Sequence, residues 1–106
     1  MGWIDEYNQR QYRQMLFSIE LCESEHASAG EVFNSLIFLS NCLEGVDQQW
    51  KEQLIQIAGI LEEVYSYTRI ENRKMSDSEK SLVKESLHNL RAYIQPMLTN
   101  DDLEID

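Results

Sequence analysis

The apolar residues between Gly45 and Asn72 recur at steps of three and four. Steps of this size place side chains on one stripe of an α-helix and not on one face of a strand. The stripe consists of Trp50, Leu54, Ile57, Ala58, Leu61, Val64, Tyr65 and Thr68. Asp47 can cap the start of this helix, and Gly45 can end the helix before it. A helix of about 25 residues is roughly 37 Å long, so we expect the other helices to pack against it.

Two further helices are predicted before this segment. The first starts at Ile4 or Asp5 and ends near Glu23, and its stripe consists of Tyr12, Met15, Leu16, Ile19 and Cys22. The second begins after a polar break, where Ser28 and Glu31 form a capping-box pattern. Its apolar residues are Val32, Phe33, Leu36, Ile37, Phe38, Leu39 and Leu43. They surround most of the helix, which is typical of a helix at the centre of a core or one covered by a partner.

The last predicted helix starts at Ser76, where Glu79 repeats the capping-box pattern. Its stripe consists of Leu82, Val83, Leu87, Leu90, Tyr93 and Ile94. Pro96 limits this helix, because the residue before a proline avoids helical backbone angles. These segments predict an all-α fold, a compact four-helix bundle over residues 1–98 with antiparallel helices, short loops and a long central third helix. Residues 99–106 are expected to form a short, mobile acidic tail.

Nineteen acidic residues against nine basic ones give the chain a formal net charge of −10. This charge disfavours binding to nucleic acid, whose phosphates attract Lys and Arg, and it gives no attraction to an anionic membrane surface. It favours a basic protein partner, because complementary fields steer association. The acidity could equally serve only to keep a small protein soluble.

The redox and targeting features of the sequence favour a cytoplasmic protein. No apolar stretch is suited to a signal peptide or a membrane span. In an antiparallel pair of helices, Cys22 and Cys42 would lie roughly 15 Å apart along the axis. A disulfide requires Cα atoms within about 7 Å, so we expect both cysteines to be reduced thiols in the core.

Motifs for catalysis or metal binding are weak in this sequence. Two Glu-x-x-His pairs, Glu23 with His26 and Glu85 with His88, have the spacing found in di-iron carboxylate bundles. The first pair falls where a predicted helix ends, and the second shares the solvent face of its helix with basic residues. No glycine-rich phosphate loop and no nucleophile motif occurs. We therefore expect no metal, no cofactor and no catalytic activity.

The acidic residues gather where basic residues are missing. No Lys or Arg occurs over 14–50, and most basic residues lie in 69–91. In the third helix, Ile60 and Tyr67 lie off the main stripe and flank Glu63, so they belong either to an interface or to an enlarged core. The predicted partner-binding residues are Glu20, Glu23, Glu25, Glu31, Asp47, Glu62, Glu63 and Tyr67.

In size, acidity and helical pattern, the whole chain resembles the small immunity proteins that neutralise bacterial toxins. Colicin-type immunity proteins carry an Asp-x-Tyr-Tyr segment, whereas the nearest segment here is Glu63-Val-Tyr65-Ser-Tyr67. The resemblance is therefore to the immunity proteins of contact-dependent growth inhibition. It implies an antitoxin that binds a cognate basic toxin, a nuclease, and blocks its active site with carboxylates that replace phosphates.

Other functions also fit the sequence. A helical adaptor or secretion chaperone would bind its partner through an apolar groove, and Phe17 and Phe38 would contribute to such a surface. A small enzyme would depend on His26 or His88. A homodimer could cover the apolar second helix, and it is compatible with both the inhibitor and the adaptor.

Overall fold

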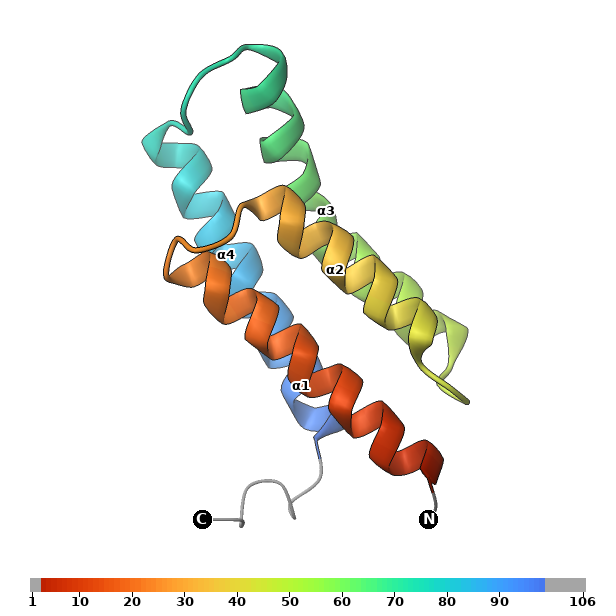
Figure 1. Cartoon of the computed structure of the whole chain (residues 1–106). Coiled ribbons are helices and arrows are strands. Elements are labelled where there is room, and N and C mark those ends of the chain that lie inside the picture. Colours follow the sequence, from red (N-terminus) through yellow and green to blue (C-terminus); the bar gives the residue numbers. More distant parts are fainter. Residues whose placement is uncertain (1–2, 99–106) are drawn as a thin grey trace.

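In the computed structural model, which describes residues 3–98, four α-helices form an antiparallel bundle (Figure 1). The helices are α1 (Trp3–Glu23), α2 (Ala29–Cys42), α3 (Gln48–Ile70) and α4 (Asp77–Ile94), and the short 3-10 turn η1 (Gln95–Met97) follows α4. Each helix packs on its neighbour in the chain, and α1 also packs on α4, so the helices close into a ring. The predicted all-α four-helix bundle is confirmed. The predicted tail lies outside the described residues.

Helix α3 is the longest of the four, but the other helices do not all pack around it. It packs chiefly on α2 and α4, and α1 packs chiefly on the same two helices from the other side. All four helices therefore contribute to one shared core. Its fully buried large side chains are Met15, Ile19, Val32, Leu36, Leu54, Leu61, Leu90 and Ile94. Burial of each such side chain contributes roughly 1.5–3 kcal/mol to stability.

The predicted stripe of α4 is wrong at Leu82, whose side chain is 45% exposed. The helix is turned so that Val83 and Leu87 face the core, and the small Ser86 is buried at the contact with α3. The hydroxyl of Ser86 donates a hydrogen bond of 3.0 Å to the backbone oxygen of Ile57. Leu82 lies one turn before Ser86 on the same side of α4, and it is exposed near the start of the helix.

The predicted helix starts are confirmed by side-chain capping. Ser28 and Glu31 form a complete capping box, in which the Glu31 N–H donates to Ser28 Oγ at 3.1 Å and the Ser28 N–H donates to Glu31 Oε1 at 2.7 Å. Ser76 and Glu79 repeat it at the start of α4. Asp47 caps α3 by accepting the Gln49 N–H at 3.1 Å. These bonds satisfy N–H groups that have no partner inside the helix.

Two glycines serve different geometric needs. Gly45, in the α2–α3 loop, has a φ of +67°, a conformation that suits glycine because it has no Cβ. Gly30 instead lies in helical backbone, directly under the ring of Tyr65. A Cβ added at Gly30 would lie 2.5 Å from Cδ2 of that ring. The missing side chain at Gly30 therefore lets α2 and α3 lie close together.

The end of the bundle that carries the α2–α3 loop is held by polar and aromatic contacts between distant segments. The Asn8 side chain donates to the Glu44 backbone oxygen at 2.7 Å and accepts the Glu44 N–H at 3.0 Å. The ring of Trp50 stacks on Tyr93 with centroids 5.0 Å apart and meets the edge of Tyr12 at 5.6 Å. The Tyr93 hydroxyl also donates to the Trp50 backbone oxygen at 3.0 Å. These contacts tie the α2–α3 loop and α4 to α1 and α3.

Both cysteines, Cys22 and Cys42, are free and half-buried, and Cys22 packs against the core. Burial raises the pKa of the Cys22 thiol, and the nearby carboxylates of Glu23 and Glu31 raise it further. The thiolate is the reactive form, so a raised pKa makes Cys22 a poor nucleophile at neutral pH.

Candidate partner-binding surfaces

The eight predicted partner-binding residues are all exposed and belong to three segments of the fold. The first group surrounds the α1–α2 loop and contains Glu20, Glu23, Glu25 and Glu31. Asp47 lies alone, in the loop at the other end of the bundle. The third group, Glu62, Glu63 and Tyr67, lies on the second half of α3.

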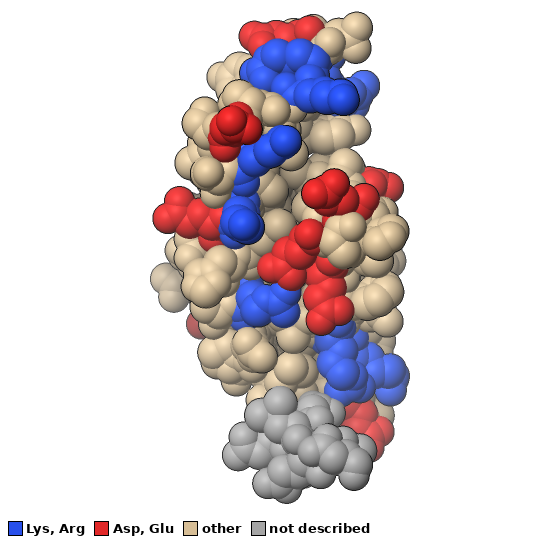
Figure 2. Space-filling view, turned by 90° about the vertical axis from the view of Figure 1, so that its left-hand side faces the viewer, with Lys and Arg blue, Asp and Glu red and all other residues tan. Residues whose placement is uncertain are grey.

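The first group does not form a purely acidic surface, because α4 brings basic residues next to it. Glu23 forms an ion pair with Arg91 of α4. Lys80 and Lys84 of the same helix line one groove together with Glu25. Figure 2, which shows the side of the molecule at the left of Figure 1, displays acidic and basic side chains mixed over this face. The acids of α1 are separated from bases in sequence but not in space.

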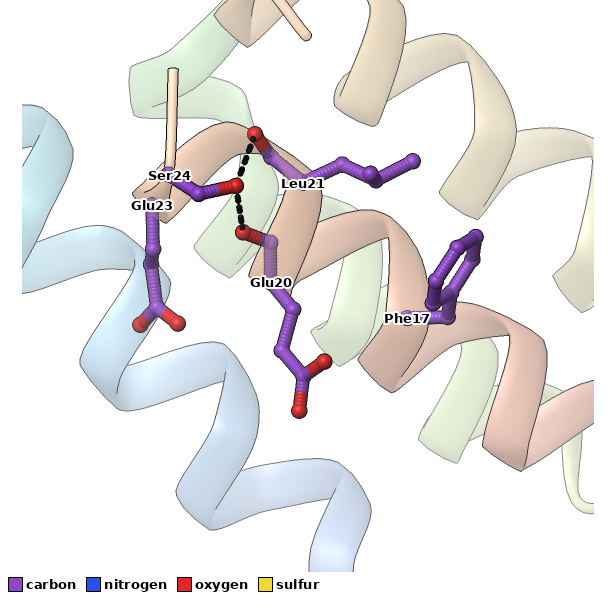
Figure 3. Close-up of a pocket in the computed structure, with 5 residues that line it drawn as sticks. All are labelled: Phe17, Glu20, Leu21, Glu23 and Ser24. Carbon is purple, nitrogen blue, oxygen red and sulfur yellow. Dashed lines mark hydrogen bonds between the residues drawn. The ribbon is translucent and has the colours of Figure 1, made fainter. Parts of the chain in front are cut away.

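A shallow depression of about 370 Å³ lies on the outer surface of α1 near its end. Figure 3 shows the carboxylates of Glu20 and Glu23 pointing to the side of α1 that faces α4, with Phe17 and Leu21 on the other side. The Ser24 hydroxyl donates to the backbone oxygens of Glu20 and Leu21, at 3.0 and 3.2 Å. The Phe17 side chain is 54% exposed.

Some of the predicted carboxylates have structural roles that a binding experiment must take into account. Glu31 belongs to the capping box of α2, and Asp47 caps α3. Replacing such a residue removes a cap, which typically costs about 0.5–2 kcal/mol of stability. Among the contacts of residues 3–98, the Glu62 carboxylate accepts one side-chain hydrogen bond, from the Ser66 hydroxyl of the same helix at 2.7 Å. Glu62 and Glu63 are therefore the better positions for probing a partner.

The hairpin formed by α2, α3 and their loop, residues 29–70, holds the clearest excess of negative charge. Its acidic residues, all exposed, are Glu31, Glu44, Asp47, Glu52, Glu62 and Glu63. It has only two basic residues, and both have local partners. Lys51 Nζ donates to the Leu43 backbone oxygen at 3.3 Å, and the Arg69 guanidinium lies over the Tyr65 ring at 5.6 Å. We call this segment the acidic hairpin.

Apolar side chains are also exposed on the acidic hairpin. Phe38 is 67% exposed, because it lies about half a turn away from the buried Leu36 on α2. Of the two α3 residues with alternative predictions, Ile60 is half-buried against the core and Tyr67 is 54% exposed. Ile60 is thus part of an enlarged core, whereas Tyr67 is available to a partner. The sequence pattern does not predict that the exposed Phe38 lies on the same hairpin as the carboxylates that outnumber its basic residues.

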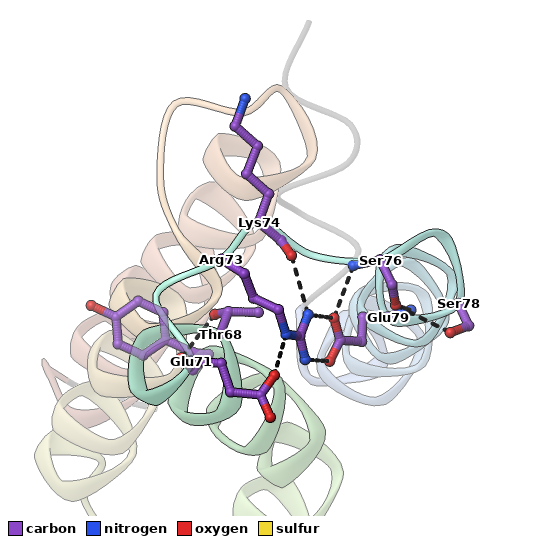
Figure 4. Close-up of polar contacts among 8 residues, drawn as sticks. Thr68, Glu71, Arg73, Lys74, Ser76, Ser78 and Glu79 are labelled. Atoms are coloured by element: carbon purple, nitrogen blue, oxygen red, sulfur yellow. Dashed lines mark hydrogen bonds and ion pairs between the residues drawn. The ribbon is translucent and has the colours of Figure 1, made fainter.

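An arginine-centred cluster holds the α3–α4 loop (Figure 4). The guanidinium of Arg73 donates two hydrogen bonds to the carboxylate of Glu79, at 2.7 and 2.8 Å, and it also pairs with Glu71. Glu79 additionally accepts the Ser76 N–H at 2.9 Å. The hydrogen bonds from Arg73, followed by that from the Ser76 backbone, lower the pKa of Glu79 to about 2.

This shift predicts an acid-sensitive contribution to stability. Because the pKa of Glu79 is lower in the folded state, its contribution is present above pH 4.5 and is lost as pH falls towards about 2. We expect the stability difference between the wild type and Glu79→Gln to shrink over this range when urea unfolding is followed by circular dichroism. Glu85→Gln, an exposed site on α4, serves as the control for losing one carboxylate. A difference that stays constant down to pH 2 would contradict the assignment.

In the part of the chain that the structure describes, neither histidine belongs to a cluster of side chains that could bind a metal ion. His26 is exposed in the α1–α2 loop, where its Nδ1 lies 2.9 Å from the Ser24 hydroxyl, and His88 is exposed on α4. Within residues 3–98, no three side chains of His, Cys, Asp or Glu gather closely enough to hold a metal ion. None of the described helices combines the length and apolar character needed to cross a membrane.

Comparisons with family models, with curated proteins and with solved structures find no match to this chain. The geometry and charge of its own surfaces must therefore carry any functional conclusion.

Proposed function

We propose that this protein is an inhibitor that binds a basic protein through the acidic hairpin. The observation that carries the proposal is the distribution of charge in the fold. The bases of α4 lie beside the acids at the end of α1 and line one groove with Glu31, whereas the rest of the hairpin carries Glu44, Asp47, Glu52, Glu62 and Glu63 and contains only Lys51 and Arg69 as bases. Both of those cations have local partners. A cationic partner would therefore meet an almost unopposed negative field.

The expected mode of binding combines charge with aromatic anchors. Carboxylates such as Glu62 and Glu63 would pair with Lys and Arg of the partner and would occupy positions that phosphates otherwise take. Exposed aromatic side chains dominate the binding energy at many interfaces, and Phe38 and Tyr67 are the exposed aromatic residues of this hairpin. A nuclease toxin has a cationic cleft of the required kind, so the proposal includes an immunity protein that blocks such a cleft.

The partner can be isolated by co-expressing the tagged protein with the products of its neighbouring genes and identifying what co-purifies. For that partner, we expect the association rate to fall steeply as salt rises, because the Debye length shortens to about 8 Å at 0.15 M. Glu62→Lys combined with Glu63→Lys should weaken affinity by about a hundredfold or more, because like charges then face each other. Glu85→Lys on α4 should leave affinity within about threefold and is the matched control.

Inhibition is tested separately from binding. The isolated partner should lose its nuclease activity when one equivalent of the wild-type protein is added, and it should keep that activity when the Glu62→Lys, Glu63→Lys variant is added. An affinity insensitive to salt and to both charge reversals would contradict the proposal.

A second candidate function is favoured by the exposed side chains of Phe17 and Phe38. An adaptor or secretion chaperone would use them as an apolar docking surface. Its affinity would be almost independent of salt and would fall by about tenfold or more on Phe38→Ala. The salt series on the isolated partner therefore distinguishes the two candidates.

A further inference from the structure

A large groove lies at the end of the bundle that carries the α1–α2 and α3–α4 loops. It has a volume of about 1040 Å³, comparable to the upper range of ligand-binding pockets. Apolar side chains from three segments line it, including Tyr65 of α3, Met75 of the α3–α4 loop, and Val83 and Leu87 of α4. We call it the end groove. It differs in position and in chemistry from the outer surface of the acidic hairpin.

The two sides of the end groove carry opposite charges. Lys74, Lys80 and Lys84 line the side formed by the α3–α4 loop and α4, and Glu25 and Glu31 line the side formed by the α1–α2 loop and the start of α2. In Figure 4 the Lys74 side chain points away from the arginine-centred cluster. Within the part of the chain that the structure describes, none of these three ammonium groups has a hydrogen bond or an ion pair.

The lysines of α4 have an arrangement that costs stability in the free protein. Lys80 and Lys84 are four residues apart on one helix, and like charges at this spacing repel each other. Within residues 3–98, neither lysine has a hydrogen bond or an ion pair from its ammonium group that would offset this cost. An anionic group bound between them would relieve the repulsion. In a chain with a net charge of −10, this local concentration of unpaired cations indicates an anionic ligand.

The walls of the end groove are held in place before any ligand binds. The pairing of Arg73 with Glu79 fixes the loop that carries Lys74 and Met75. Capping boxes fix the starts of both α2 and α4 beside the groove. The close approach of Gly30 to the Tyr65 ring sets the distance between α2 and α3 there. A pre-formed site loses little conformational entropy on binding.

We propose that the end groove binds a short peptide segment of a partner protein. Apolar side chains of the segment would cover the half-buried Tyr65 and Met75, and at least one acidic side chain would pair with Lys80 and Lys84. A basic side chain reaching Glu25 across the groove would set the direction of the segment. An extended apolar floor between two charged sides suits a peptide, which carries both kinds of group along its length. This inference does not depend on the proposed inhibitor function.

The test begins with a selection from a displayed library of random peptides of about twelve residues, using the intact protein. Enriched peptides should combine apolar residues with Asp or Glu. A synthetic copy of the most enriched peptide, labelled with a fluorophore, is then titrated by anisotropy. Lys80→Glu combined with Lys84→Glu should weaken its binding by about tenfold or more, whereas Arg10→Glu, at the other end of α1, should not.

A charge exchange makes the test specific. A peptide with its acidic residues replaced by Lys should bind poorly to the wild type and should recover affinity for the Lys80→Glu, Lys84→Glu variant. Circular dichroism of both variants checks that they are folded, and Lys80→Gln with Lys84→Gln repeats the measurement without charge reversal. The proposal is overturned if no peptide is enriched, if enriched peptides lack acidic residues, or if the lysine variants bind equally well. Displacement of every peptide by dodecanoate with higher affinity would instead assign the groove to small anionic amphiphiles.

Discussion

Leu61→Ala is expected to lower the free energy of unfolding by about 2–5 kcal/mol, whereas Leu82→Ala is expected to lower it by less than about 1 kcal/mol. Leu61 is fully buried at the centre of α3, so its truncation leaves a cavity in the shared core. Leu82 is 45% exposed, so its truncation removes little buried surface. The first loss is a large part of the 5–15 kcal/mol that stabilises a typical domain.

Urea unfolding followed by circular dichroism measures both variants on the same scale. Their midpoints should differ clearly while the slopes of the transitions stay equal, because the same surface is exposed on unfolding. Similar losses for the two leucines would mean that Leu82 is buried, as the sequence pattern alone predicts.

The different burial of Leu61 and Leu82 shows which parts of this fold the sequence predicts and which it does not. Helical spacing and the capping residues predict four helices and their starts, because both signals are local. The spacing does not fix how deeply each residue of a stripe is buried. On one side of α4, Ser86 is buried and its hydroxyl reaches the backbone of α3 29 residues earlier in the chain, whereas Leu82, one turn before it, is exposed. A contact of this kind has no signature in the local sequence.

Asn8→Ala is expected to lower the free energy of unfolding by about 2–3 kcal/mol. Its side chain makes two hydrogen bonds to the backbone of Glu44, and each such bond contributes about 1 kcal/mol, with a further cost when buried partners are left unpaired. The residue itself is only 8% exposed, so water cannot easily replace the lost carboxamide. Thermal unfolding followed by circular dichroism measures the loss.

Asn89→Ala is the matched control, because Asn89 is an exposed residue on α4. It should change stability by no more than about 0.5 kcal/mol. Asn8→Asp keeps an acceptor for the Glu44 N–H but places a carboxylate near the Glu44 carbonyl oxygen, so it should be nearly as harmful as Asn8→Ala at neutral pH. If Asn8→Ala unfolds at the same temperature as Asn89→Ala, the two bonds to Glu44 contribute nothing.

The sequence predicts which types of residue form the candidate surfaces, but it does not predict which of these residues lie together in the fold. The acidic residues and the absence of Lys and Arg over 14–50 are visible in the sequence. Which acids remain unopposed depends on the fold, since Arg91 pairs with Glu23 across 68 residues of chain. The same topology places Lys80 and Lys84 opposite Glu25 and so creates the end groove. Distance along the sequence therefore does not show which acidic residues have basic neighbours in the fold, because the packing of the helices decides this.

The ring of helices also has a consequence for the order in which the chain folds. Three of its interfaces join helices connected by only five or six residues, so they form with a small loss of loop entropy. The fourth joins α1 to α4 and to η1, where the Gln9 side chain donates to the Met97 backbone oxygen across 88 residues. Domains dominated by local contacts fold within about microseconds to milliseconds. We therefore expect the α1–α4 interface to close last during folding and to open first.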